Sequence, residues 1–134
     1  MKKKKYQVFT QSVDIYRHDI LVCVGATCDQ ARGTISKRDT KFREFLEEYK
    51  FCFDKILSGK QLGYTLYEKE TGHMVLIIKK YENNWVYWET LIHELNHIVY
   101  DLAVMKSFTD ETEAQAYLQE FLFHEIRRKI QLSK

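Results

Sequence analysis

The segment that most constrains the fold lies between residues 85 and 105 and reads WVYWETLIHELNHIVYDLAVM. Its apolar residues recur at intervals of three and four, which predicts a helix with one buried face. The recurring positions are Leu91, Leu95, Ile98, Val99 and Leu102. Asn83 or Asn84 is suited to cap the start, because an Asn side chain accepts hydrogen bonds from the first N–H groups of a helix.

This helix carries His93-Glu94-Leu95-Asn96-His97, which is the H-E-x-x-H pattern. Residues four apart on a helix differ by about 40° around the axis and about 6 Å along it. The imidazoles of His93 and His97 can therefore reach one zinc ion at about 2.0–2.1 Å. Glu94 is suited to act as the general base that activates a zinc-bound water.

A third zinc ligand is needed, and His2Glu is a recurrent catalytic set. A last helix is predicted from about residue 110 to about residue 132, and Glu111 and Glu113 lie at its start. If the two helices form an antiparallel hairpin, Glu113 comes level with His97, since both are equally far from Met105. This geometry favours Glu113, with Glu111 as the alternative.

The two motifs, His93-Glu94-x-x-His97 and Glu113-Ala-Gln-Ala-Tyr117, resemble those of the glutamate zincins. The similarity is to the small cytoplasmic peptidases of the ImmA/IrrE type, which are related to phages and mobile elements, and covers the order of elements over about residues 54–124. It implies zinc held by His93, His97 and Glu113, with Glu94 as the catalytic base. It also implies an α+β, zincin-like core: a small, mostly antiparallel sheet of about four strands, a backing helix, the active-site helix and a C-terminal glutamate-bearing helix.

Further residues are candidates for supporting roles. Asp101, four residues after His97, could orient one of the zinc-binding histidines through its free ring nitrogen. A hydroxyl that stabilises the oxyanion could come from one of four tyrosines, although packing in the core is the alternative for each. The four are Tyr81, Tyr87, Tyr100 and Tyr117.

Four segments are predicted as strands. Residues 6–15 and 19–24 are the first two, and residues 62–68 and 73–80 form a hairpin around a glycine-containing turn. The last of these leads into the motif helix. We expect it to have an unpaired edge at the mouth of the site, where an extended peptide could add as a further strand.

The remaining segments complete one domain that spans residues 1–134. Residues 36–57 are predicted to form a single amphipathic helix, and residues 25–33 a loop. The chain has no proline, so no proline-rich linker divides it.

Composition excludes several classes of protein. The 21 basic and 19 acidic residues leave a charge of +2, which gives no large footprint for nucleic acid, and we interpret the basic runs at 2–5 and 127–129 as solvated. Three cysteines without CxxC spacing argue against a disulfide framework and favour the cytoplasm. Neither an export signal nor a membrane-spanning segment is predicted.

The sequence thus predicts a zinc-dependent metallopeptidase, a hydrolase acting on a protein or peptide substrate. One alternative is a non-catalytic interaction module with the same fold, in which zinc is structural or absent. Another is a metal-dependent hydrolase that cleaves a different bond. The substrate and the oligomeric state are left open.

Overall fold

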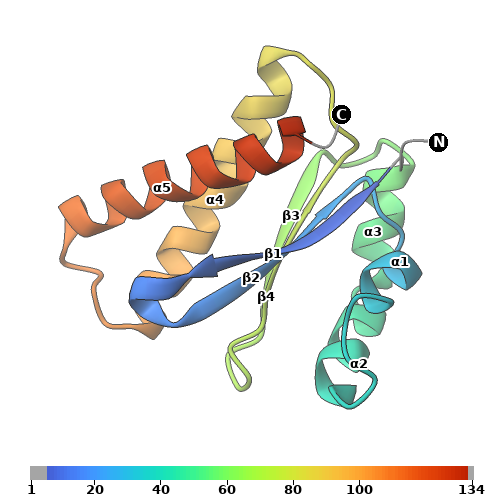
Figure 1. Cartoon of the computed structure of the whole chain (residues 1–134), viewed down its shortest axis with the longest axis horizontal. Coiled ribbons are helices and arrows are strands. Elements are labelled where there is room, and N and C mark those ends of the chain that lie inside the picture. Colours follow the sequence, from blue (N-terminus) through green and yellow to red (C-terminus); the bar gives the residue numbers. More distant parts are fainter. Residues whose placement is uncertain (1–5, 133–134) are drawn as a thin grey trace.

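The computed structural model describes residues 6–132 and has an α+β fold, in which helices cover both faces of a four-stranded sheet (Figure 1). The strands are β1 (Gln7–Val13), β2 (His18–Val24), β3 (Gly63–Tyr67) and β4 (Met74–Ile78), and their order in the sheet is β1-β2-β4-β3. The prediction of an α+β fold with four strands is confirmed.

The sheet is mixed. Its outer pairs, β1–β2 and β3–β4, are antiparallel, whereas the central pair β2–β4 is parallel. A parallel pair needs a crossover connection, and the helical segment between β2 and β3 carries the chain across one face of the sheet.

The strand with the free edge next to the motif helix is β3, and the expectation that β4 would have it is wrong. All five residues of β4, MVLII, are buried, because β4 lies between β2 and β3. A continuous apolar run of this kind is typical of an interior strand.

One face of the sheet is covered by α2 (Thr40–Glu48) and α3 (Lys50–Leu57), so the prediction of one helix over residues 36–57 is wrong. Helix α2 begins after Asp39, whose side chain accepts a hydrogen bond from the Phe42 N–H at 3.2 Å. It ends at Glu48, because the dihedral angles of the next residue, Tyr49 (φ −104°, ψ 22°), are not helical. The break lets both short helices turn apolar residues toward the sheet.

The predicted loop at residues 25–33 also contains a helix, α1 (Cys28–Arg32). Thr27 and Gln30 form a capping box at its start: the Gln30 N–H donates to the Thr27 hydroxyl at 3.0 Å and the Thr27 N–H donates to the Gln30 side chain at 2.9 Å. These paired bonds stabilise a helix that is too short to be recognised from its apolar pattern.

The other face is covered by α4 (Trp85–Met105) and α5 (Thr112–Leu132), which confirms the two predicted C-terminal helices. Asn84 caps α4 by accepting a hydrogen bond from the Tyr87 N–H at 2.9 Å. The two helices and the sheet share one cluster of buried side chains. From α5 it takes Leu118, Leu122, Ile126 and Ile130.

Two of the basic residues at 127–129 are not simply solvated. Arg127 stacks over the rings of Trp88 and Phe123, and the Lys129 Nζ lies 2.7 Å from the Gln11 Oε1. The other basic run, residues 2–5, lies outside the described residues.

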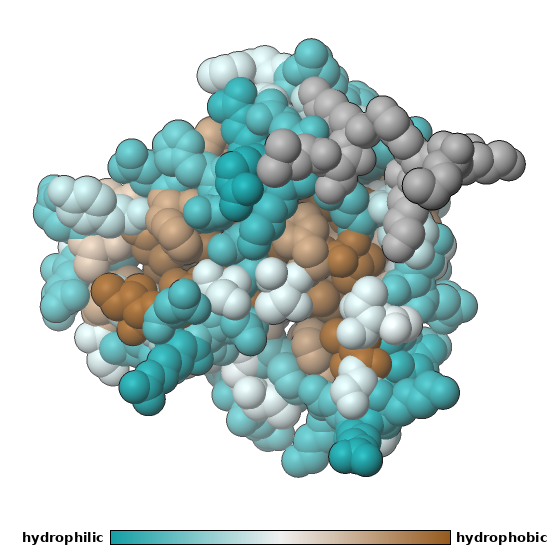
Figure 2. Space-filling model, in the orientation of Figure 1, coloured by the Kyte–Doolittle hydropathy of each residue, from teal (hydrophilic) through white to brown (hydrophobic). Residues whose placement is uncertain are grey.

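In the view of Figure 2, hydrophilic side chains cover most of the molecule and apolar ones appear in separate patches. Over residues 6–132, no helix has the length and apolar character needed to cross a membrane.

The buried stripe of α4 should dominate stability. Leu95 is fully buried in the cluster shared by α4, α5 and the sheet, so Leu95→Ala should lower the free energy of unfolding by about 2–5 kcal/mol. Leu57→Ala, at an exposed position at the end of α3, should change it by less than about 0.5 kcal/mol. Urea denaturation measures both, and similar losses in the two variants would contradict this account of the core.

Candidate functional site

The histidines and the glutamate of the HExxH motif lie in different surroundings. His93 and His97 are exposed one turn apart on α4, with ring centroids 5.0 Å apart and ring planes at 80°. Glu94 is only 6% exposed, because a step of one residue turns its side chain about 100° around the helix, toward the sheet. The motif therefore presents two open imidazoles beside one enclosed carboxylate.

Thr65 of β3 holds this carboxylate. Its hydroxyl lies 2.9 Å from the Glu94 Oε1 and 3.1 Å from the backbone oxygen of the same residue, so a single proton is shared between two acceptors. The Glu94 Oε2 lies 4.0 Å from the His93 Nε2. The glutamate is thus fixed on one side by a strand and borders the histidine face on the other.

Gly63 makes this close approach of β3 and α4 possible. A Cβ atom at this position would lie 2.9 Å from the Glu94 Cγ and 3.2 Å from the Thr90 Cγ2. Any side chain here would push the strand away from the glutamate. Neither Gly63 nor Thr65 is among the residues predicted from the sequence, although a signal was available: they alternate on one face of a predicted strand, as small or polar residues among apolar and aromatic ones.

The free edge of β3 runs beside Glu94. The Glu68 N–H bonds to the His73 carbonyl at 3.0 Å, and the Lys79 N–H bonds to the Leu62 carbonyl at 3.2 Å. With the antiparallel register of β3 and β4, these bonds turn the backbone groups of residues 62, 64, 66 and 68 toward β4. The N–H and C=O groups of the alternating residues, Thr65 among them, point away from the sheet.

In the described part of the chain, the predicted third ligand is not grouped with the histidines closely enough to hold a metal ion. Along the α4–α5 pair, the Trp88 ring packs against Phe123, and the Gln119 Nε2 donates to the Ile92 carbonyl at 3.3 Å. This pairing puts Glu113 nearly level with His97. However, Glu113 is exposed in the first turn of α5, on the side of the helix opposite its buried stripe.

The chain consequently gathers two of the three predicted ligands. Among residues 6–132, no three His, Cys, Asp or Glu side chains are grouped closely enough to hold a metal ion. Glu111, the alternative ligand, is exposed just before α5 begins. A zinc site completed by Glu113 or Glu111 stays a prediction.

Asp101 interacts electrostatically with the second histidine of the motif. Burial raises the pKa of its carboxyl group, and the charges of His97 and Lys69 partly oppose this effect. Asp101 lies one turn beyond His97 on α4, so it is better placed to orient His97 than His93.

Of the four candidate tyrosines, Tyr100 lies on the histidine face of α4, three residues beyond His97, and is 62% exposed. The Tyr87 hydroxyl is committed elsewhere, since it donates to the Lys79 carbonyl at 3.0 Å, and burial raises its pKa. Tyr81 packs against Tyr87 and Trp88, and Tyr117 lies at a separate groove. Tyr100 is thus the best placed of the four to donate a hydrogen bond near the histidines.

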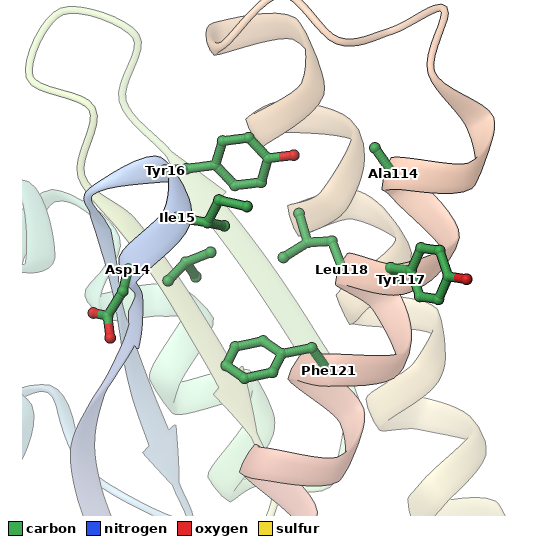
Figure 3. A pocket seen from close by; sticks show the side chains of 8 residues that line it. Asp14, Ile15, Tyr16, Ala114, Tyr117, Leu118 and Phe121 are labelled. Carbon is green, nitrogen blue, oxygen red and sulfur yellow. The ribbon is translucent and has the colours of Figure 1, made fainter.

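That separate groove, of about 470 Å³, lies between α5 and the turn after β1, which includes the 3-10 helix η1 (Asp14–Tyr16). In Figure 3, Ile15 and Phe121 point into it from opposite walls, whereas the carboxylate of Asp14 points away from α5. The groove is apolar, and neither the HExxH residues nor Glu113 line it.

Comparisons with protein families, with curated proteins and with solved structures gave no match. The resemblance to the glutamate zincins therefore rests on the two motifs, and the candidate site rests on the geometry of α4 and β3.

The bond between Thr65 and Glu94 can be tested through stability. Thr65→Val keeps the shape of the side chain but leaves a buried acceptor without its donor, so it should lower the free energy of unfolding by about 1–3 kcal/mol. Thr65→Ser retains the hydroxyl and should lose less, which chemical denaturation would show. Equal losses in the two variants would mean that the methyl group of Thr65 matters and the hydrogen bond does not.

Proposed function

We propose that the chain is a zinc-dependent peptidase that uses His93 and His97 as metal ligands and Glu94 as general base. One observation carries this proposal: two exposed imidazoles share a helix face beside an enclosed carboxylate, at the open edge of a strand.

The residues on α4 fit zinc in their chemistry. Imidazole nitrogen is a standard zinc ligand, and ligands one helical turn apart can share an ion. Both rings are open to solvent, so an incoming ion would displace only water. Asp101 would support His97 through the second ring nitrogen, as metal-bound histidines usually require.

The remaining position belongs to Glu113 in this proposal, with Glu111 as its alternative. Both carboxylates are exposed near the start of α5. The proposal therefore requires that a change in the first turn of α5 accompany binding of the metal.

When bound, zinc would supply Lewis acidity, which polarises a peptide carbonyl and makes a water molecule acidic at neutral pH. Glu94 takes the proton of the attacking water at Oε2 and delivers it to the nitrogen of the departing amine. Thr65 fixes Oε1, so Oε2 remains directed toward the histidine face. The Tyr100 hydroxyl is available to stabilise the oxyanion.

The substrate in this proposal is an extended segment of a protein. The N–H and C=O groups that β3 turns away from β4 can bond a peptide as an additional strand, which gives affinity through the main chain. Of these groups, the Gly63 carbonyl already accepts a hydrogen bond from the Gln61 Nε2 at 3.4 Å. A peptide at this edge would pass beside Glu94, since Thr65 belongs to the same strand and contacts that glutamate.

A non-catalytic interaction module is the second candidate. Two observations favour it. The described residues bring together only two of the three predicted zinc ligands, and the exposed apolar groove near Ile15 is a surface that a partner could cover. Hydrolysis of a bond other than a peptide would use the same residues.

Glu94→Gln should abolish hydrolysis and leave the fold and the metal content unchanged, because the amide keeps the shape of the carboxylate but cannot accept the proton. The assay is cleavage of a proteome-derived peptide library, read by mass spectrometry, with zinc-loaded protein. Glu89→Gln, an exposed glutamate of the same helix, is the matched control. Cleavage by Glu94→Gln at the wild-type rate would remove Glu94 from the mechanism.

Metal content tests the ligand set. Protein purified without chelator or tag metal, and kept dilute enough to remain as single chains, should contain about one zinc per chain by elemental mass spectrometry, as the His2Glu set requires. His97→Ala and Glu113→Ala should each lose most of this zinc, and Glu120→Ala, an exposed glutamate further along α5, should not. A wild-type protein that takes up no zinc would rule out the peptidase proposed here.

A further inference from the structure

The solvent-facing side of α4 carries a stripe that no other element covers in the described part of the chain. At 100° per residue, its members fall within about 60° of one another around the helix. The stripe consists of Val86, His93, His97, Tyr100 and Val104, all exposed. Three of the five are large hydrophobic residues, which are unusual in such a row on a surface that faces only water.

Charges are scarce along this side of α4. The helix contains Glu89, Glu94 and Asp101 and no Lys or Arg, and Glu94 is buried. Scarcity of charge, together with exposed aromatic and aliphatic residues, is typical of the centre of a protein interface.

Four of the five stripe residues are placed symmetrically about Leu95, and Tyr100, whose symmetric position is Thr90, is the exception. Val86 and Val104 are equally far from Leu95 along the helix, and so are His93 and His97. If a second copy of α4 lies antiparallel across the stripe, valine meets valine at both ends and histidine meets histidine in the middle. This is the self-complementary pattern that a two-fold interface requires.

The two-fold arrangement also supplies the ligands that one chain lacks. The described residues of one chain offer an imidazole pair but no third ligand close to it. Two copies related by an axis at Leu95 bring four imidazoles to one level. Four ligands in a tetrahedron are the usual coordination of zinc in structural sites.

We propose that two copies of this chain form an antiparallel dimer through α4, bridged by one zinc ion that His93 and His97 of each copy bind. Glu113 has no part in this site. Such a dimer covers the face of α4 beside Glu94 and the free edge of β3. Where the proposed peptidase function holds, and only this consequence rests on it, the dimer is an inactive form of the protein.

The test is the mass of the full-length protein in solution, measured by sedimentation equilibrium during a zinc titration. Metal-free protein should have the mass of one chain. On addition of zinc, the mass should double and reach its end point at one zinc per two chains.

Variants separate the interface from other zinc effects. His97→Ala should prevent dimerisation, and His124→Ala, an exposed histidine on α5, should leave it unchanged. Val104→Glu, which sets a carboxylate opposite Val86 of the second copy, should weaken dimerisation at least tenfold. Leu57→Glu, at an exposed position on α3, is its control, and circular dichroism checks that each variant is folded.

Three results would overturn the dimer: binding of one zinc per chain at the mass of a single chain at every protein concentration, a dimer that persists without zinc, or no uptake of zinc. If the first result occurs and Glu113→Ala abolishes the binding, the dimer is refuted and the His2Glu centre stands. A zinc dimer with the stated stoichiometry, formed by a protein that cleaves no peptide even when diluted to single chains, would support the dimer and refute the peptidase.

Discussion

The packing of one side of α4 against the central strands is the interaction on which the rest of the structure depends. Leu91, Leu95 and Ile98 are fully buried in the cluster that also holds β2, β4 and α5. Removing such side chains from water is the largest favourable contribution to folding. It fixes the rotation of α4 and thereby directs Glu94 toward β3 and leaves both histidines in solvent.

Elements with strong local signals could be predicted from the sequence. The start of α4 at Asn83 or Asn84, the hairpin of β3 and β4 and the two long C-terminal helices follow from capping, turn residues and period, and Asn84 is the residue that caps α4. The break between α2 and α3 could not, because Tyr49 is neither a glycine nor a proline and its local preference does not mark the end of a helix. Which strand lies at the edge depends on pairing between distant segments, and no local pattern encodes it.

In the candidate site, too, the residues with a local signal could be predicted and those that depend on packing between distant segments could not. His93, Glu94 and His97 follow from spacing on one helix, whereas the contribution of Thr65 depends on the side of β3 that faces α4. The level of Glu113 along the helix pair follows from its spacing to Met105, but the direction of its side chain does not. The buried stripe of α5, which includes Leu118 and Leu122, sets that direction, and it turns Glu113 toward solvent.

The mixed pairing of the sheet bears on how the protein folds. Each antiparallel pair joins neighbours in the chain, whereas the parallel pair joins Ile20 to Met74 across the whole helical crossover. Contacts between distant segments form late and slow folding, because the conformational entropy of the intervening chain is lost before these contacts stabilise the folded state. Glu94 and Thr65 both lie after that crossover, so the link between strand and motif can form within one contiguous stretch before the sheet is complete.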